Sequence, residues 1–234
     1  MTTTHKRFDA VIFDLFGTLI ENFRIDELNS VLREMALALT IPPVVFRKQW
    51  TASFHARCLG EFSNIEANLE MISRELGRPI DPVAISEAAR IRAAYSKTFL
   101  ERLFPDSIST LSEIKARGYK LGLISDCSTE VPSLWAKSQI AEFFDVVIFS
   151  SVIKIKKPDR RIYELALKQL GTSSERTLYI GDGGSHELSG AAAVGMTPLL
   201  IQNRASRDGE YVVDVDSWVG PRIRSPIETL EYLK

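Results

Sequence analysis

Five short apolar runs recur along the chain and are separated by stretches with helical periodicity. The runs are Asp9 to Asp14, Tyr119 to Ser125, Asp145 to Phe149, Thr177 to Gly181 and Thr197 to Ile201. The first run, Ala10 to Phe13, is apolar at consecutive positions, which is typical of a strand buried on both faces of a parallel sheet. The pattern therefore predicts five parallel strands.

Amphipathic segments precede several of these runs. One segment places Ile108, Leu111 and Ile114 on a single stripe and stops at Gly118, a residue that suits the left-handed position after a helix end. A helix of small residues is predicted from Ser185 to Val194. Strands that alternate with helices in this way predict an α/β fold, with a doubly wound, Rossmann-like parallel sheet as its core.

The stretch from Glu21 to Leu103 differs because it shows no strand pattern. Ile25 to Leu39 carries apolar residues at helical spacing, and Asp81 followed by Pro82 suits a helix N-cap and first turn. A crossover between parallel strands needs far fewer residues. We expect residues 21–103 to form an inserted helical cap domain that closes on a ligand. Residues 1–20 and 104–234 would then form the core.

The composition is that of an ordinary folded protein. Of the 234 residues, 45% are hydrophobic and 25% charged, which suggests neither disorder nor a fibre. A formal net charge of -1 and a pI near 6.3 provide no general basic field for nucleic acid. We expect a small anionic substrate, and neither nucleic acid nor a membrane as a partner. No pattern indicates the oligomeric state.

The first residues and the cysteines favour a cytoplasmic protein. Residues 1–7 are polar and lack the apolar core of a signal peptide, and no run is long enough to span a bilayer. Cys58 and Cys127 have no spacing typical of a metal site or a disulfide framework. Reduced thiols in the cytoplasm are the simplest interpretation.

Candidate chemistry lies where the predicted strands end. Asp14 ends the first strand and Ser125 the second, while Asp182 and Glu187 follow the fourth. Lys157 precedes a predicted helix. The carboxyl ends of parallel strands share one edge of the sheet, which is where such sheets bind ligands. Taken singly, each residue has an ordinary explanation: an acid before a glycine turn is more often a cap, and a lysine among lysines is more often solvated.

The four segments in their order resemble the haloacid dehalogenase-like hydrolase superfamily. They are Asp-x-x-Gly-Thr at Asp14, the strand-terminal Ser125, Lys157-Pro158, and Gly181-Asp182 with a second acid at Glu187. The helical insertion resembles the family's cap of the first structural type. The resemblance covers nearly the whole chain.

This resemblance implies an aspartyl-enzyme mechanism. In the family's phosphatases the acid that matches Asp14 attacks phosphorus, and water hydrolyses the intermediate. Ser125 and the backbone of Gly17 and Thr18 would donate to the phosphoryl oxygens, and Lys157 would supply a fixed positive charge.

The resemblance also implies a Mg²⁺ cofactor. Asp14, the Phe16 carbonyl and Asp182 would bind the metal, and Glu187 would hold a metal-bound water or orient the lysine. Asp126 is ambiguous between a turn cap and a partner of that lysine.

Phe16 departs from the phosphatase pattern. Those enzymes usually carry a second aspartate at this position, which protonates the leaving oxygen, whereas a phenyl ring has no proton to give. A positioned acid or base contributes roughly 10² to 10⁴ in rate. Three alternatives follow: the leaving group needs no proton, another acid comes from the cap, or the protein is a poor catalyst.

The family's 2-haloacid dehalogenases place an aromatic residue at the same position, because a halide leaves without protonation. Tyr163 and Arg47 resemble dehalogenase residues, although Tyr163 is at least as well explained by core packing. Asp182 and Gly184 stand where those enzymes carry serine and asparagine, and an uncompensated acid beside Asp14 would repel a haloacid. The sequence favours a Mg²⁺-dependent phosphatase on a small phosphorylated metabolite. A dehalogenase and a non-catalytic anion-binding or partner-binding protein remain as alternatives.

Overall fold

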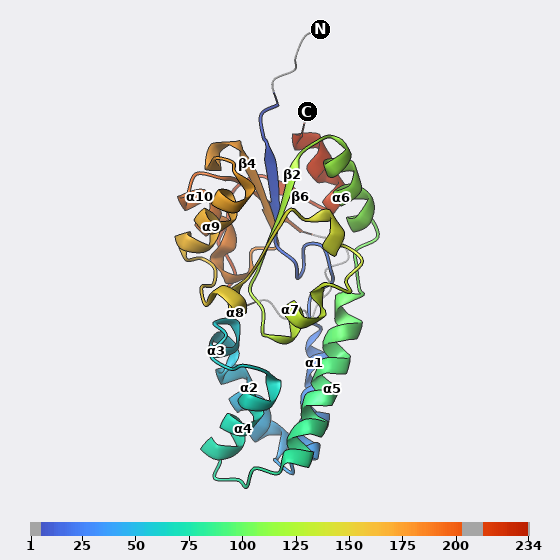
Figure 1. The fold of residues 1–234 in the computed structure, drawn as a ribbon, viewed down its shortest axis with the longest axis vertical. Helices are drawn as coiled ribbons and strands as arrows, with labels where there is room; N and C mark the ends of the chain where they lie inside the picture. Colours follow the sequence, from blue (N-terminus) through green and yellow to red (C-terminus); the bar gives the residue numbers. More distant parts are fainter. Residues whose placement is uncertain (1–5, 203–212, 234) are drawn as a thin grey trace.

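The computed structural model describes residues 6–202 and 213–233, which form two lobes (Figure 1). One lobe contains a sheet whose neighbouring strands all pair in parallel, in the order β3-β2-β1-β4-β5-β6. The strands are β1 (Ala10–Phe13), β2 (Lys120–Ser125), β3 (Val146–Phe149), β4 (Thr177–Gly181), β5 (Thr197–Ile201) and β6 (Arg222–Ile223). The predicted parallel sheet is confirmed. β6 was not predicted, because a strand of two residues is too short to show a pattern of apolar positions.

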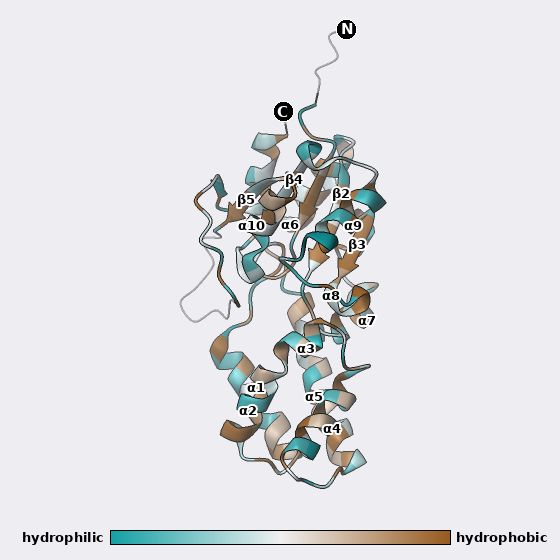
Figure 2. Cartoon of the chain, turned by 90° about the vertical axis from the view of Figure 1, so that its left-hand side faces the viewer, coloured by the Kyte–Doolittle hydropathy of each residue, from teal (hydrophilic) through white to brown (hydrophobic). Residues whose placement is uncertain are grey.

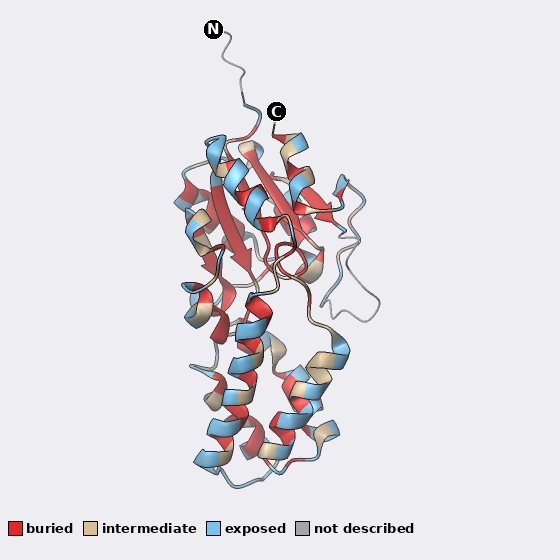
Figure 3. Cartoon of the chain, turned by 90° about the vertical axis from the view of Figure 1, so that its right-hand side faces the viewer, coloured by how far each residue is buried: buried red, intermediate tan, exposed pale blue. Residues whose placement is uncertain are grey.

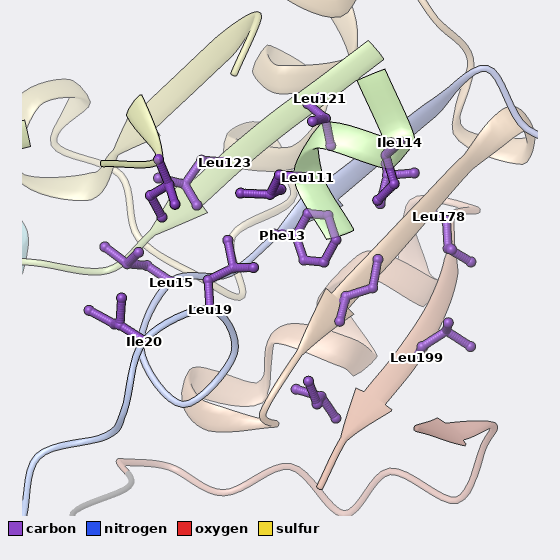
Figure 4. Packing of buried hydrophobic residues seen from close by; sticks show 14 of the residues in the cluster. Phe13, Leu15, Leu19, Ile20, Leu111, Ile114, Leu121, Leu123, Leu178 and Leu199 are labelled. Carbon is purple, nitrogen blue, oxygen red and sulfur yellow. The ribbon is translucent and has the colours of Figure 1, made fainter. Parts of the chain in front are cut away.

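Helices cover both faces of this sheet, as a doubly wound fold requires. Neighbouring residues of a strand point to opposite faces, so Phe13 and Ile12 belong to different apolar clusters. Phe13 packs in one cluster with Leu111 and Ile114 (Figure 4). The covering helices are α6 (Ser107–Ala116) and η4 (Pro226–Tyr232) on one face, and α9 (Arg160–Leu170) and α10 (Glu187–Ala193) on the other. The strands are apolar and buried between them (Figures 2 and 3).

The helix expected from Ser185 to Val194 begins two residues later than predicted, at Glu187. Ser185 and His186 have φ of 55° and 49°, so they form a left-handed turn within the short η3 (Gly184–His186). Histidine is among the residues enriched at positive φ, and periodicity alone does not reveal such a turn. The turn matters because it starts the helix with Glu187 fully buried.

The second lobe consists of helices inserted between β1 and β2, and we call it the helical lobe (Figures 1 and 3). Its helices are α1 (Ile25–Ala38), α2 (Pro43–Ala52), α3 (Phe54–Cys58), α4 (Ile65–Glu75) and α5 (Pro82–Leu100). They share an apolar cluster of their own, which includes Met35, Phe46 and Leu69. All five lie within the predicted range 21–103. Closure of this lobe on a ligand remains a prediction.

One helix reaches from the helical lobe into the sheet lobe. α5 begins at the predicted cap, where the Asp81 carboxylate accepts the backbone N–H of Val83 at 2.9 Å. Its last turn places Phe99 in the same apolar cluster as Phe13. The long helix therefore ties the two cores together.

Short elements complete the described chain. They are α7 (Glu130–Trp135), η1 (Ala141–Phe143), α8 (Ser150–Ile153) and η2 (Ser174–Arg176). Cys58 and Cys127 are free and buried, and burial raises the pKa of Cys58 to about 12. Taken one by one, the helices of the described residues are too short or too polar to cross a membrane; α1 and α2 meet that test only as a pair bent by 112°.

Candidate active site

The site lies where the strand order changes direction. β1 leads to β2 and β3 on one side, whereas β4 and β5 follow on the other. A crevice forms at the carboxyl ends of strands at such a switch point. Asp14 follows β1 and Asp182 follows β4, so this topology brings together two acids that are far apart in the sequence.

Lys157 connects Asp14, the candidate nucleophile, with Glu187. Its Nζ donates to Asp14 Oδ1 at 2.5 Å and to Glu187 Oε2 at 2.6 Å. The residue is only 3% exposed, so it is not a solvated surface lysine. Burial alone would lower the pKa of Lys157, but the carboxylates of Asp14 and Glu187 outweigh it and raise the pKa well above its usual value. The ammonium therefore remains charged beside Asp14.

Glu187 is held by several donors. Besides Lys157, the Tyr179 hydroxyl donates to Oε2 at 2.8 Å and the Gly183 N–H donates to Oε1 at 3.0 Å. A side chain on Gly181 would collide with this carboxylate, so glycine makes room for it. Burial and the Asp14 charge raise the pKa of Glu187, and Lys157 opposes them. These bonds favour the expected role of Glu187 in orienting the lysine.

Asp182 is fixed by the loop after β1. Asn22 Nδ2 donates to Oδ2 at 2.9 Å, and the Gly184 N–H donates to Oδ1 at 2.9 Å. Burial, and then repulsion by Asp14, raise the pKa of Asp182 to about 7. Sequence reasoning missed Asn22, because a single polar residue in a loop carries no distinguishing pattern.

Gly17 provides the close approach between these loops. Its φ is 74°, and a Cβ there would collide with the Asp182 carboxylate. We expect Gly17→Ala to lower the free energy of unfolding by about 1–3 kcal/mol through overpacking and backbone strain. Urea denaturation measures the loss. Gly77→Ala is the matched control, because φ is 62° there but no atom lies within 4 Å of the added carbon. Equal losses in the two variants would contradict the role given to Gly17.

Three carboxylates form the acidic side of the site. Oxygens of Asp14, Asp182 and Glu187 all lie within 4.8 Å of one another, and one ammonium, that of Lys157, balances them. Uncompensated negative charge of this kind raises pKa values unless a cation is bound. An all-oxygen donor set suits a hard divalent cation. The residues present therefore fit the expected metal.

The other predicted phosphate-binding residues lie close by, with different surroundings. The Thr18 hydroxyl donates to Asp14 Oδ2 at 3.3 Å. Asp126 Oδ1 accepts the backbone N–H of Lys157 at 3.1 Å. Ser125 ends β2 as predicted, but it is fully buried, its Oγ has no hydrogen-bond partner, and it is not among the residues that line the cavity. A contact of Ser125 with phosphate stays a prediction.

A cavity of about 310 Å³ opens between the strand ends and the helical lobe. Asp14, Asp126, Lys157 and Asp182 line it from the sheet lobe. Its other wall is largely apolar, with Phe23, Ile25, Leu28, Leu32, Trp50 and Phe54. Arg47 lines the cavity as expected and donates to Asn29 at 3.4 Å. Tyr163 does not line it; its ring is buried and its hydroxyl donates to the Glu187 carbonyl at 3.0 Å.

Phe16 lines the cavity beside the nucleophile candidate. Its ring stacks on Phe23 and Phe99, with centroids 5.1 and 5.7 Å away. The side chain that replaces the usual acid is thus part of an aromatic cluster that joins the two lobes.

Two arginines of the helical lobe were not predicted as cavity residues. Arg92 Nε donates to Glu130 at 3.0 Å, in an ion pair that is more than nine-tenths buried and joins α5 to α7. The Arg57 guanidinium lies 4.0 Å from the centroid of the Trp50 ring. Burial alone would raise the pKa of Glu130, but the charge of Arg92 contributes to a net lowering. Arginines in amphipathic helices usually face solvent, so sequence gave no signal.

Comparison with known proteins gives two named activities. The glyceraldehyde 3-phosphate phosphatase of Methanothermobacter thermautotrophicus is 36% identical over 118 residues, which cover 48% of this chain and 51% of that protein. The match therefore spans only about half the length of that relative. The (S)-2-haloacid dehalogenase of Pseudomonas sp. strain YL is 25% identical over 95% of this chain and 94% of its own.

A solved structure shows the same fold over almost the whole chain. The 2-haloacid dehalogenase of Pseudomonas syringae pv. tomato DC3000 superposes with a TM-score of 0.69 at 22% identity, covering 96% of this chain and 97% of that one. The family model for haloacid dehalogenase-like hydrolases matches residues 8–195, a range that contains all the acidic and basic residues placed around Asp14 above. With so much of its length matched, this chain belongs to the haloacid dehalogenase-like hydrolase family.

Proposed function

We propose that the protein is a divalent-cation-dependent phosphatase that hydrolyses a small phosphate monoester through Asp14. The observation that carries this proposal is the clustering of Asp14, Asp182 and Glu187, whose oxygens lie within 4.8 Å of one another beside a single lysine. A haloacid would meet two further acids there, whereas a phosphatase requires a cation at this place. The arrangement also argues against a protein that has lost its chemistry.

Each residue of the cluster has a role in phosphoryl transfer. An Asp14 oxygen attacks phosphorus in line with the leaving oxygen, and water then hydrolyses the aspartyl phosphate. Lys157 neutralises charge beside the nucleophile, and Glu187 fixes its ammonium. A Mg²⁺ held by Asp14 and Asp182 would supply the positive charge that lets a carboxylate approach an anionic phosphoryl group. Asn22 holds Asp182 in place for this task.

The substrate is proposed to be a small phosphorylated metabolite. A cavity of about 310 Å³ is at the small end of the range for ligand pockets. Relatives named glyceraldehyde 3-phosphate phosphatase support this size class. The apolar wall of the helical lobe favours a substrate with a hydrocarbon part.

A second candidate function is hydrolysis of a carbon–halogen bond. Phe16 favours this reaction, because a halide leaves without being protonated. The rings of Phe16, Phe23 and Phe99 have no proton to give to a leaving group. In that reaction Asp14 would displace the halide from carbon, and water would hydrolyse the resulting ester.

Metal removal separates the two functions. We expect EDTA to abolish phosphate release and excess Mg²⁺ to restore it. Mg²⁺ should also raise the melting temperature of the wild type, because a ligand that binds only the folded state stabilises it. This rise should be much smaller in Asp182→Asn and unchanged in Asp216→Asn, whose carboxylate instead binds Ser189. Chloride release from 2-chloropropionate that survives EDTA, without phosphatase activity, would establish the dehalogenase instead.

A further inference from the structure

The proposed phosphatase lacks a proton donor at its usual place, and the present inference rests on that proposed function. An alkyl phosphate releases a strongly basic oxygen, so an acid within reach of that oxygen must protonate it. Phe16 does not serve, because its phenyl ring has no proton to give; it packs against Phe23 and Phe99, which stack on each other. The acid must come from another residue of the cavity.

Three carboxyl groups line the cavity among the described residues: those of Asp14, Asp126 and Asp182. Asp14 is the proposed nucleophile. Asp182 is the proposed metal ligand, and its two oxygens are already held by Asn22 and by the Gly184 N–H.

The helical lobe supplies no replacement acid. The ionisable side chains that its described residues place on the cavity wall are Arg47, Arg57 and Arg92. A guanidinium does not give up its proton in proteins. The alternative of an acid from the cap is therefore not supported by the described residues, and Asp126 is the carboxyl that remains.

The surroundings of Asp126 suit a protonated carboxyl group. Its Oδ1 accepts the backbone N–H of Lys157, whereas its Oδ2 is shielded from solvent and has no hydrogen-bond partner. A buried charged oxygen without a hydrogen-bond donor costs more free energy than a buried neutral O–H. The O–H can then donate to an oxygen of a bound substrate. Burial raises the pKa of Asp126, although the charges of Lys157 and Lys156, the Lys157 N–H and the Ser185 hydroxyl oppose the shift.

The fold also places Asp126 on the side of the nucleophile away from the metal-binding acid. Asp126 follows β2, Asp14 follows β1 and Asp182 follows β4, and these strands are neighbours in the order β2-β1-β4. The aspartates are therefore arranged across the crevice with the nucleophile in the middle.

We propose that Asp126 is the general acid and base of this site. In the first step an Asp14 oxygen bonds to phosphorus, the ester P–O bond breaks, and the Asp126 proton passes to the leaving oxygen, which departs as an alcohol. In the second step water attacks phosphorus, its proton passes to the Asp126 carboxylate, and the bond from phosphorus to Asp14 breaks. Inorganic phosphate leaves, and both carboxyl groups return to their starting states.

The test compares two esters in wild type and Asp126→Asn with Mg²⁺ present. Glycerol 2-phosphate releases a basic alkoxide, whereas 4-nitrophenyl phosphate releases a phenolate that needs no proton. The kcat/KM for the alkyl ester should fall by roughly 10² to 10⁴ relative to that for the aryl ester. The ratio of the two values does not depend on how much of the variant folds. Asp159→Asn is the matched control, because that side chain caps α9 and does not line the cavity.

A rapid-mixing experiment provides a second readout. Asp126→Asn should release one equivalent of nitrophenolate per enzyme in a burst and then turn over slowly, because the base for the second step is missing. An unchanged ester ratio, or the absence of a burst, would overturn the role of Asp126. Wild type that hydrolyses neither ester would instead overturn the proposed function, and this assignment with it.

Discussion

Replacement of Asp14 by asparagine should lower kcat by about 10⁴-fold or more on every substrate that the wild type turns over, because nucleophile loss removes the covalent path. Both the phosphatase and the dehalogenase function require this carboxylate, so the result does not depend on which is correct. The amide is close in size, and Lys157 keeps its bond to Glu187. Steady-state assays measure the loss, and circular dichroism verifies the fold.

Asp9→Asn is the control for this experiment. Asp9 immediately precedes β1, at the opposite end from Asp14, and forms a partly exposed ion pair with Arg176. Loss of that pair should cost no more than about 1 kcal/mol and leave kcat unchanged. Activity of Asp14→Asn within tenfold of the wild type would refute the assignment of the nucleophile.

Replacement of Lys157 by methionine should lower the free energy of unfolding by about 3–5 kcal/mol, the usual result of removing one partner from a buried ion pair. Asp14 and Glu187 would then face each other without the ammonium that both now accept. Proton uptake relieves this repulsion: a carboxyl whose folded-state pKa is raised loses stability as pH increases through that range. The loss should therefore be larger at pH 8 than at pH 5.

Mg²⁺ should recover part of the stability lost in Lys157→Met, since a cation held by Asp14 and Asp182 would offset the Asp14 charge that the ammonium no longer neutralises. Urea denaturation at both pH values, with and without Mg²⁺, measures these effects. Lys156→Met is the matched control, because Lys156 lies next in the chain but donates only to a backbone carbonyl, at 3.4 Å. Equal destabilisation of the two variants would contradict the structural role of Lys157.

Much of the fold could be predicted from the sequence because its signals are local. Short apolar runs marked the first five strands, and Gly118 and Asp81 marked helix ends that the structure confirms. The juxtaposition of Asp14 and Asp182 also followed, because parallel strands end at one edge of the sheet.

Other features depend on packing between distant segments and were not predictable. Asn22 and Asp182 are 160 residues apart, and the sequence gives no reason to pair them. The pairing of Arg92 with Glu130 requires α5 to meet α7, which periodicity does not determine. The left-handed turn at His186 was missed because a short helix of small residues hides it.

The continuity of α5 has a mechanical consequence. Its 19 residues correspond to a rod about 28 Å long, anchored at one end among helices and at the other by Phe99 against the ring of Phe16. Because a continuous helix does not bend at its midpoint, any rotation of the helical lobe must displace Phe99. This displacement would tilt the aromatic cluster next to Asp14. Movement of the helical lobe would thus change the shape of the cavity in which the reaction takes place.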